Sequence, residues 1–245
     1  MQTNSDAREK RPVISVIIPA YNERDTIAST IALIRGVDID KEIIVVDDGS
    51  TDGTREILQT LAGSDLTVIL QPQNAGKGSA IRAGIPQAQG DIIIIQDADA
   101  EYDPGEYPKL IAPILAGKTD VVYGSRFLME DEKGRRLRWP EGMAFPNWFI
   151  NRLLAGMANL LYGAKITDEA TCYKVFRAEI LKAIPLVCTR FEFCPEVTAK
   201  IRRRKIPILE VPITYRGRTS QQGKKINWRD GVEAIWTLLK YRFGE

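Results

Sequence analysis

The sequence predicts an α/β fold in which a mostly parallel, Rossmann-like sheet carries helices on both faces. Short apolar runs rich in β-branched residues alternate with segments of helical periodicity, as in sheets built from strand–helix–strand units. The runs are apolar throughout, which is expected of strands covered on both faces. With 245 residues, 44% of them hydrophobic and 27% charged, the chain is long and apolar enough to bury a sizeable core.

The first half of the chain is expected to alternate five strands with four helices. The strands are the apolar runs at 13–18, 42–46, 66–70, 91–95 and 120–123. The helices are marked by apolar residues at helical spacing within 27–35, 57–61, 74–85 and 104–115. Asn22 is expected to cap the first of these helices, and Ser50 or Thr51 the second.

The pattern changes after Arg126, where charged and irregular segments become frequent. The charged stretch 130–139 predicts a mobile loop, and the polar stretch 219–225 predicts another loop. Helices are expected at 145–161, 178–183 and 228–243, with a short irregular segment at 167–176. Residues 206–213 are expected to form an edge strand, because the prolines within them cannot donate a ladder hydrogen bond.

Composition excludes several classes of chemistry. The chain has no histidine, so acid–base or metal chemistry must use carboxylates, Lys, Arg, Tyr or Cys. Cys172, Cys188 and Cys194 lack metal-site spacing, and their odd number suggests reduced thiols in a reducing compartment. A net charge of +2 gives no global field toward nucleic acid. No run approaches the ~20 apolar residues of a membrane-spanning helix, and the polar start of the chain lacks a signal-peptide pattern.

Acidic side chains follow three of the expected strands. The groups are Tyr21 with Glu23, Asp47 with Asp48, and Asp97 with Asp99 and Glu101. Ligands of open parallel sheets bind beyond the carboxyl ends of the strands. Crowded carboxylates repel one another unless a cation or donor compensates them, so we expect a metal ion or a cationic ligand here.

The segment Asp97-Ala98-Asp99 is the sharpest of these signals. Residues two apart on an extended segment share a face, and oxygen ligands without Cys or His suit Mg²⁺ or Mn²⁺. Glu101 continues the same spacing. Such a cation would bridge a diphosphate and stabilise the charge on a departing nucleotide. The alternative is a set of solvated loop acids.

Two further segments have competing interpretations. Asp47 and Asp48 are ordinary turn residues, but a functional interpretation places Asp48 on a ribose or base. Gly76-Lys77-Gly78 is a candidate glycine loop at a helix N-terminus, a position that attracts anions. The spacing of a phosphate-loop ATPase is absent from it.

Together, five motifs in order resemble family 2 glycosyltransferases of the GT-A fold, and within them the dolichyl- or polyprenyl-phosphate hexose synthases. The motifs are Pro19-Ala20-Tyr21-Asn22-Glu23, the segment 47–54, the segment 74–78, Asp97-Ala98-Asp99 and Gly124-Ser125-Arg126. The resemblance covers about residues 13–241. It implies inverting transfer of a hexose from a nucleotide-diphosphate sugar, of GDP-mannose or UDP-glucose type, to a polyprenyl or dolichyl phosphate, with Mg²⁺ or Mn²⁺ as cofactor.

The resemblance also assigns roles to individual positions. The implied nucleotide-sugar site comprises Pro19, Tyr21, Glu23, Val46, Asp48, Lys77, Asp97, Ala98, Asp99, Arg126, Arg218 and Lys224. The implied metal ligands are Asp97, Asp99 and Glu101, although Gln often stands where this chain has Glu101. The segment 167–174 departs from the Ser-Gly-Phe form of the mannose synthases and resembles bacterial relatives, some of which use other donors.

The expected catalytic residues are Asp99, Arg126, Arg152 and Asp168. A lipid phosphate is already anionic, so transfer to it depends on positioning and charge stabilisation. Arg126 and Arg152 are candidates for holding that phosphate, the alternative for Arg152 being a solvated helix residue. A hydroxyl acceptor would need a base, for which Asp168 is the candidate, its alternative being a cap or turn residue.

A polyprenyl tail needs an apolar surface on which to lie. The candidates are Trp139, Met143, Phe145, Trp148, Phe149, Leu153 and Leu154, with Lys133, Arg135, Arg136 and Arg138 available for anionic headgroups. The final helix, with Ile235, Trp236, Leu238 and Leu239, either packs on the domain or lies on a membrane. The alternative to a lipid-binding surface is that the aromatic residues belong to the core and that the charged loop is a solvated face.

These observations give an expected organisation and three functional hypotheses. We expect a disordered tail at 1–11 and one domain at 12–245, with a nucleotide-sugar half at 12–126 and an acceptor half at 127–245. The leading hypothesis is a cytoplasmic polyprenyl-phosphate hexosyltransferase, with a peripheral position at the membrane face and a membrane-anchored partner subunit as further possibilities. The alternatives are a soluble glycosyltransferase acting on a hydroxyl of a polysaccharide or small molecule, and a nucleotide-binding protein without catalysis.

Overall fold

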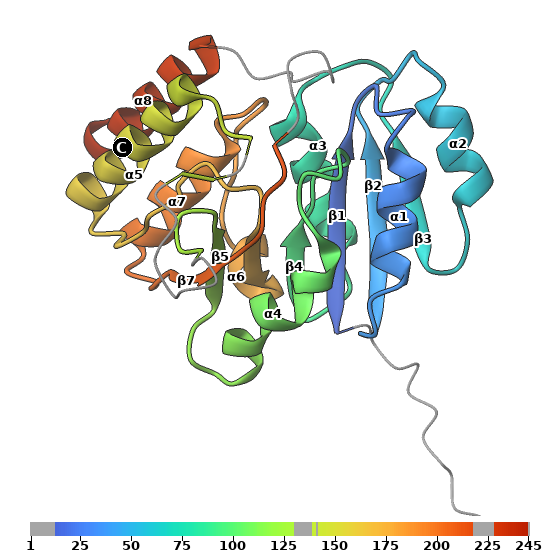
Figure 1. Cartoon of the computed structure of the whole chain (residues 1–245), viewed down its shortest axis with the longest axis horizontal. Coiled ribbons are helices and arrows are strands. Elements are labelled where there is room, and N and C mark those ends of the chain that lie inside the picture. The colour runs from blue at the N-terminus through green and yellow to red at the C-terminus, as the bar shows by residue number, and fades with distance from the viewer. Residues whose placement is uncertain (1–12, 130–138, 141, 218–227, 245) are drawn as a thin grey trace, which may run out of the picture.

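A seven-stranded sheet organises the chain in the computed structural model, which describes residues 13–129, 139–140, 142–217 and 228–244 (Figure 1). The strands are β1 Ile14–Ala20, β2 Lys41–Asp47, β3 Leu66–Leu70, β4 Ile92–Ile95, β5 Val121–Ser125, β6 Lys174–Arg177 and β7 Leu209–Pro212. The helices are α1 Ile27–Arg35, α2 Thr54–Leu61, α3 Lys77–Gly84, α4 Tyr107–Leu115, α5 Phe145–Tyr162, α6 Ala178–Lys182, α7 Phe193–Arg203 and α8 Trp228–Phe243. Two short 3₁₀ helices, η1 Ile85–Gln87 and η2 Pro104–Glu106, precede β4 and α4.

The strand order is β3-β2-β1-β4-β6-β5-β7. β1 pairs in parallel with β2 and β4, β2 with β3, and β5 with β7, whereas β6 runs antiparallel to both of its neighbours. The register places Ala20 opposite Asp47, so β1 and β2 end level with each other. Helices α1 and α4 cover one face of the sheet and α3 the other (Figure 1), which confirms the predicted α/β class.

Two cores hold these layers together. The main core is made by both faces of the sheet with the inner faces of its helices, and Ile17, Val46 and Ile94 are fully buried in it. A second, smaller cluster joins α5, α7 and α8, with Leu154, Ala199 and Leu238 at its centre. This helical layer lies on the β5–β7 side of the sheet (Figure 1). None of the described helices is both long and apolar enough to cross a bilayer.

The prediction of an irregular segment at 167–176 is wrong for its last three residues, because β6 begins at Lys174. Lys174 hides this strand in the sequence, since a lysine seldom lies in a sheet interior. Here the Lys174 side chain is fully buried. Its Nζ donates to the backbone carbonyl of Glu169 at 2.6 Å and lies 3.7 Å from the centre of the Tyr123 ring.

The expected helix caps are also wrong. Helix α1 begins after Thr26 and α2 after Gly53, and neither of these residues makes a side-chain cap hydrogen bond. Asn22 and Ser50 instead bond to each other's loops. The backbone N–H of Asn22 donates to Ser50 Oγ at 2.9 Å, and the N–H of Thr51 donates to Asn22 Oδ1 at 2.9 Å. The expected tail at 1–11 and the expected loops at 130–139 and 219–225 lie wholly or largely outside the described residues.

Candidate active site

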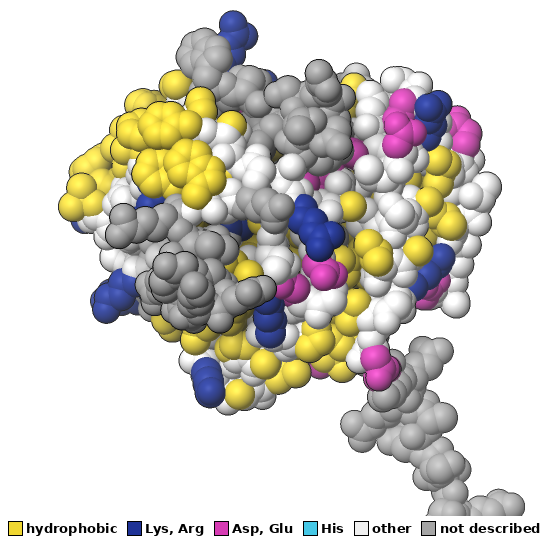
Figure 2. All heavy atoms as spheres, viewed as in Figure 1, with side chains coloured by type: hydrophobic (Ala, Val, Ile, Leu, Met, Phe, Trp, Pro, Cys, Tyr) yellow, Lys and Arg dark blue, Asp and Glu magenta, His cyan; other side chains and the backbone are white. Residues whose placement is uncertain are grey.

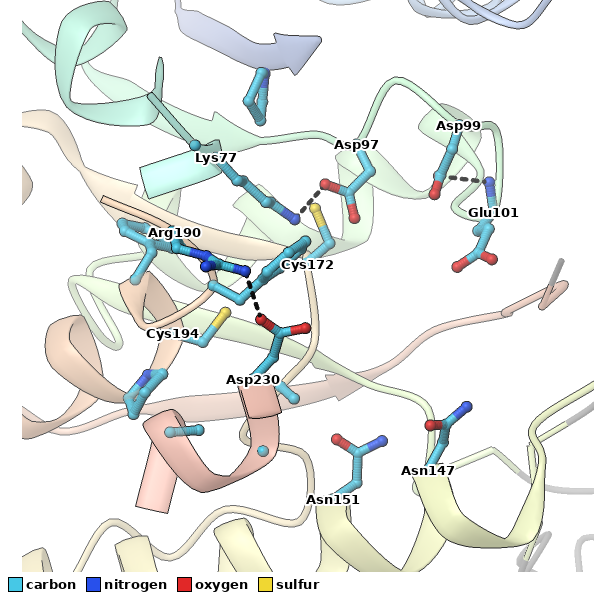
Figure 3. Close-up of a pocket in the computed structure, with 18 of the residues that line it drawn as sticks. Lys77, Asp97, Asp99, Glu101, Asn147, Asn151, Cys172, Arg190, Cys194 and Asp230 are labelled. Atoms are coloured by element: carbon cyan, nitrogen blue, oxygen red, sulfur yellow. Dashed lines mark hydrogen bonds and ion pairs between the residues drawn. The ribbon is translucent and has the colours of Figure 1, made fainter. Parts of the chain in front are cut away.

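A cavity of about 1010 Å³ opens at the carboxyl ends of β1, β2 and β4. β1 lies between β2 and β4 in the sheet, so the loops after these three strands meet at one edge, as ligand sites of open α/β sheets do. Ten of the residues expected to bind nucleotide sugar or metal line this cavity: Pro19, Tyr21, Glu23, Asp48, Lys77, Asp97, Ala98, Asp99, Glu101 and Arg126. Figure 3 shows part of this set around the cavity.

Three expected site residues are not among its lining. Val46 is fully buried in β2, and Arg152 and Asp168 lie outside the lining described for the cavity. Arg218 and Lys224 lie outside the described residues. The motif acids therefore line one cavity, whereas Arg152 and Asp168 lie outside its lining.

The loops after β1 and β2 are held together by Asn22. Its φ of 50° is in the left-handed region, which Asn tolerates better than most residues. This conformation lets the backbone and side chain of Asn22 bond at the same time to Ser50 and Thr51. The cavity wall at the ends of β1 and β2 is thus built from two loops joined by these hydrogen bonds.

The two neighbouring acids at the end of β2 have different surroundings. The Asp47 side chain is fully buried, and its Oδ2 accepts from Arg55 Nε at 2.6 Å and from the backbone of Ser50 at 3.2 Å. Asp48 lines the cavity, and its two carboxylate oxygens accept from the N–H groups of Ala75 at 2.9 Å and Gly76 at 2.7 Å. Asp47 is therefore structural, while Asp48 fixes the turn that leads into α3.

Several amide donors of the expected anion site at the start of α3 already have partners within the protein, since Gly76 donates to Asp48. The N–H of Gly78 donates to the carbonyl of Arg190, and that of Ser79 to the carbonyl of Thr189, both at 2.9 Å. A Cβ at Gly76 would lie 2.4 Å from the Thr189 carbonyl oxygen, and one at Gly78 would lie 2.8 Å from that of Arg190. The absence of a side chain at Gly76 and Gly78 thus allows the backbone of residues 189–190 to pack against the start of α3.

Lys77 nevertheless projects its side chain into the cavity, where Nζ lies 2.5 Å from Asp97 Oδ1 (Figure 3). Burial alone would lower the pKa of Lys77, but the charge of Asp97 outweighs it and holds that pKa above its usual value. Lys77 is therefore a cation in the site at any ordinary pH.

Asp97 and Asp99 provide the donor set expected for a hard divalent cation. Both line the cavity, and their shared loop is tied to α1 by Thr30 Oγ1, which donates to the carbonyl of Ala98 at 3.2 Å. Asp99 Oδ1 accepts from the backbone of Glu101 at 3.2 Å. Among the described residues, no three acids or cysteines come close enough to form a metal cluster by themselves. Two carboxylates fit Mg²⁺, which commonly takes its remaining ligands from substrate phosphates and water.

Arg126 forms a buried ion pair with Asp168. Its Nε and Nη2 each lie 2.7 Å from a carboxylate oxygen, and its backbone N–H donates to Asp168 Oδ2 at 3.0 Å. The guanidinium also lies 5.0 Å from the centre of the Tyr215 ring. Burial would lower the pKa of Arg126, but Asp168 holds it well above its usual value. This geometry does not favour Asp168 as a base, because its carboxylate already faces a permanent cation.

Arg152 lies on an exposed part of α5. Its Nη1 donates to the carbonyl of Thr167 at 3.2 Å, and its guanidinium lies 5.4 Å from the centre of the Phe127 ring. In this structure it therefore supports the chain near residue 167, which agrees with the alternative of a solvated helix arginine.

Apart from Leu154, the opposite wall of the cavity was not predicted from the sequence. It is formed by residues of α5, α7, α8 and the segment before α7: Asn147, Ile150, Asn151, Leu154, Arg190, Phe191, Phe193, Cys194, Pro195, Asp230, Gly231 and Ala234. The spacing of Asn147 and Asn151 could have indicated part of it, because residues four apart share a helix face. Phe191 and Phe193 carry no comparable signal.

Cys172 and Cys194 also line the cavity, and all three cysteines of the chain are free. Burial raises the pKa of both lining thiols. They are therefore held in the neutral form, which suits packing more than nucleophilic chemistry.

An aromatic surface covers the start of α5. We use this name for Trp139, Phe145, Trp148 and Phe149. The rings of Trp139 and Trp148 stack with centroids 5.3 Å apart, and Phe145 stacks with both. Phe145 is 62% and Phe149 56% exposed, and Figure 2 shows hydrophobic side chains gathered over α5 and α8.

The remaining members of the expected landing surface divide between outside and inside. Leu153 is exposed, whereas Met143 and Leu154 have little outer exposure and line the cavity. On α8, Leu238 is buried in the second core and Trp236 is exposed. Lys133, Arg135, Arg136 and Arg138 lie outside the described residues.

Known proteins similar to this chain include several sugar transferases. A dolichol-phosphate mannosyltransferase from Pyrococcus furiosus is 32% identical over 93% of this chain and 64% of its own length. The low-salt glycan biosynthesis hexosyltransferase Agl6 from Haloferax volcanii is 31% identical over 93% of this chain and 53% of its own length. This chain thus spans less than two thirds of these two relatives. An undecaprenyl-phosphate mannosyltransferase from Micrococcus luteus is 28% identical over 94% of this chain and 99% of its own length.

Solved structures show the same fold at lower identity. Glucosyl-3-phosphoglycerate synthase from Mycobacterium tuberculosis, crystallised with UDP, aligns with a TM-score of 0.71 at 23% identity over 94% of this chain and 80% of that chain. The same protein has also been crystallised with Mn²⁺, UDP and phosphoglyceric acid, and that structure aligns with a TM-score of 0.70 at 23% identity over 95% of this chain and 79% of that one. The likeness establishes the GT-A fold.

A family model provides the remaining comparison. The model described as glycosyl transferase family 2 matches residues 15–184, a stretch that begins in β1 and ends just after α6 and so contains the acidic edge of the sheet. The chain therefore belongs to glycosyl transferase family 2.

Proposed function

We propose that this chain is an inverting hexosyltransferase that moves a hexose from a nucleotide-diphosphate sugar to a polyprenyl or dolichyl phosphate. The observation that carries the proposal is the composition of the cavity. One side bears Asp97 and Asp99 (Figure 3). The side formed by α5, α7 and α8 adds apolar residues such as Ile150, Leu154 and Phe193 beside a few polar ones. Such a cavity suits a reaction between a metal-bound diphosphate and the phosphate of an apolar lipid.

The donor would occupy the sheet edge. Pro19, Tyr21, Glu23 and Asp48 are the proposed nucleoside contacts, with Val46 supporting them from within β2. The proposed division of the chain follows from this placement, with 12–126 forming the nucleotide-sugar half and 127–245 the acceptor half. The M. tuberculosis synthase was crystallised with UDP, and the transfer assay described below compares GDP-mannose with UDP-glucose as the donor.

The diphosphate would lie against Asp97, Ala98 and Asp99. These residues, with Glu101 directly or through water, would hold Mg²⁺ or Mn²⁺, which supplies positive charge to the leaving diphosphate. Lys77 and Arg126 are the basic side chains from the expected donor site that line the cavity among the described residues. Arg218 and Lys224 remain proposed contacts of the same diphosphate.

In this reaction the protein mainly has to position the donor and the acceptor. An oxygen of the anionic lipid phosphate attacks the anomeric carbon, and the bond from that carbon to the donor diphosphate breaks, so that the nucleoside diphosphate leaves with the bonding electrons. No proton needs to be removed from such an acceptor. This agrees with the surroundings of Asp168, whose carboxylate is occupied by Arg126.

Two observations support a lipid phosphate as the acceptor: the activities of similar proteins and the apolar residues in the wall formed by α5, α7 and α8. Dolichol-phosphate and undecaprenyl-phosphate transferases are among the similar proteins. The aromatic surface would let the protein lie on a bilayer while the lipid phosphate reaches the cavity. A membrane-face location and a membrane-anchored partner subunit belong to the same proposal.

A transfer assay tests the proposal directly. The full chain would be given labelled GDP-mannose, UDP-glucose and other nucleotide sugars, each with undecaprenyl or dolichyl phosphate or with water-soluble hydroxyl acceptors, in Mg²⁺, Mn²⁺ or EDTA. We expect transfer to a lipid phosphate that EDTA stops. Transfer to soluble hydroxyl acceptors alone would favour the second hypothesis. Nucleotide binding without turnover of any donor would favour the third.

A further inference from the structure

We propose that Lys77 keeps Asp97 from binding a bare divalent cation and releases it when the donor diphosphate enters the cavity. This inference rests on the donor and metal site of the proposed function. Lys77 would then be a positioning residue that makes metal binding and nucleotide binding depend on each other.

The ion pair occupies the carboxylate that the metal needs. Lys77 Nζ lies 2.5 Å from Asp97 Oδ1, and the two side chains are 22% and 20% exposed. Solvent screens so sheltered a pair less than it screens a pair at the surface. A divalent cation arriving at Asp97 would meet a positive charge already in contact with its ligand, so its affinity must fall.

The backbone beneath Lys77 is held in place. Asp48 accepts from the N–H groups of Ala75 and Gly76, and the carbonyl of Arg190 accepts from Gly78. Any movement of the ammonium group must therefore come from the flexible side chain. A lysine is suited to this, because its charge sits at the end of four rotatable carbons.

The other basic side chains among the described lining residues have different partners. Arg126 is bound to Asp168, and Arg190 Nη2 lies 3.4 Å from Asp230 Oδ1 (Figure 3). Among the basic lining residues that the structure describes, Lys77 is the one with an ion pair to the Asp-x-Asp segment. It supplies the positive charge that acids gathered at a strand end require in the absence of a ligand.

A diphosphate would change this balance in two ways. Its oxygens give the Lys77 ammonium a new anionic partner, and they give the metal additional ligands beside Asp97 and Asp99. Each ligand then favours the state that binds the other, and linkage requires the coupling to be equal in both directions.

Direct metal binding tests the inference without any transfer reaction. Mn²⁺ would be titrated into the full chain and followed by the paramagnetic resonance signal of free Mn²⁺, first alone and then with saturating UDP or GDP. Blanks would correct for Mn²⁺ bound by nucleotide in the buffer. For the wild-type chain we expect at least tenfold tighter Mn²⁺ binding with the matching nucleotide.

The variants separate charge from fold. Lys77→Met is expected to bind Mn²⁺ alone at least fivefold more tightly than wild type, and to gain less from nucleotide. Lys77→Arg keeps the charge and should retain weak binding. Lys109→Met is the matched control, because Lys109 pairs with Glu106 at 2.6 Å and does not line the cavity. If Lys77→Met does not fold, as judged by thermal unfolding, Lys77→Gln takes its place.

The outcomes distinguish the inference from the proposed function. Wild-type coupling with no gain in metal affinity on neutralising Lys77 would overturn the inference and leave the proposed function standing. A wild-type chain that binds no Mn²⁺ even with nucleotide would overturn both. Tighter binding in Lys77→Met, with Lys77→Arg and Lys109→Met unchanged, supports the inference.

Discussion

Arg126 and Asp168 form a buried, bidentate ion pair, with Nε–Oδ2 and Nη2–Oδ1 distances of 2.7 Å. Arg126 follows the end of β5 and lines the cavity, whereas the Asp168 side chain is fully buried behind it. The backbone of Asp168 is held in turn by Glu210, whose Oε1 accepts its N–H at 3.0 Å. The position of the Arg126 guanidinium in the site is therefore set by Asp168.

Asp168→Asn should destabilise the fold. Removing one partner of a buried ion pair leaves an uncompensated charge and typically costs about 3–5 kcal/mol. Urea unfolding would measure the loss. The matched control is Asp120→Asn, because Asp120 pairs with Arg177 at 2.7 Å in a partly exposed setting, where a pair contributes less, about 1 kcal/mol. A stable Asp168→Asn variant that has lost turnover would instead support the role of Asp168 as a base.

Asp99→Ala should abolish turnover while the fold persists. Asp99 lines the cavity and is partly exposed, so its carboxylate is placed for a ligand more than for the core. Loss of one group that stabilises developing charge lowers kcat by roughly 10²–10³, and loss of a metal ligand should do at least that. Steady-state transfer with each nucleotide sugar, alongside thermal unfolding, provides the measurement.

Asp103→Ala is the control for that experiment. Asp103 lies close by in the chain but outside the cavity lining, and its carboxylate caps η2 through the N–H of Gly105 at 2.8 Å. It should lose about 1 kcal/mol of stability and keep its turnover. A fully active Asp99→Ala variant would refute the metal assignment.

The glycines before α3 should prove necessary for close packing. Gly76→Ala and Gly78→Ala would each place a Cβ against the backbone of 189–190, and such overpacking costs about 1–3 kcal/mol. Gly76 should be the more sensitive, because its φ of 97° also disfavours a side chain. Gly156→Ala is the control, since nothing lies within 4 Å of a Cβ there and alanine in a helix interior should stabilise by about 0.5–1 kcal/mol. Equal unfolding midpoints for all three variants would contradict this account.

The glycine segment also shows where prediction from sequence ends. Its position at the start of a helix was predictable, because local spacing determines that. Its partner was not, because Thr189 and Arg190 are more than a hundred residues away and carry no pattern that marks contact with α3. The same holds for the wall from α5, α7 and α8, whose members come from three separate segments. By contrast, Asp48, Asp97 and Asp99 follow apolar strands directly, and the parallel sheet then brings them to one edge.

Glu196→Gln should weaken the helical layer in a pH-dependent way. Glu196 accepts from the N–H groups of Val187 at 2.8 Å and Cys188 at 2.6 Å, and from Lys200 Nζ at 2.5 Å. Burial would raise the pKa of Glu196, but the hydrogen bonds from Lys200 and Val187 outweigh it and lower that pKa below the usual 4.5. A lowered carboxyl pKa contributes stability above the unfolded-state pKa, and this contribution is lost as the pH falls through the folded-state pKa.

The difference between wild type and Glu196→Gln should therefore be largest near pH 7. A hydrogen bond to a charged group contributes about 1.5–3 kcal/mol, and we expect a loss in that range by chemical denaturation. The difference should shrink as the pH is lowered below 4.5. Glu56→Gln, at an exposed position of α2, should show no such dependence, and an equal loss from Glu196→Gln at pH 3 and pH 7 would contradict the ionic origin.

Phe149→Glu should reduce binding to lipid vesicles. Phe149 is 56% exposed within the aromatic surface, and full burial of such a side chain in an apolar phase contributes about 1.5–3 kcal/mol. Replacing it with an acid should therefore lower partition onto vesicles of neutral and anionic phospholipid by about tenfold, as measured by co-sedimentation. Leu33→Glu is the matched control, because Leu33 is 54% exposed on α1, away from α5 in Figure 1. Equal loss in both variants would mean that negative charge alone repels the protein from the vesicles. A loss confined to Phe149→Glu would identify the aromatic surface as the face that meets the membrane, because the two variants differ in position and not in added charge.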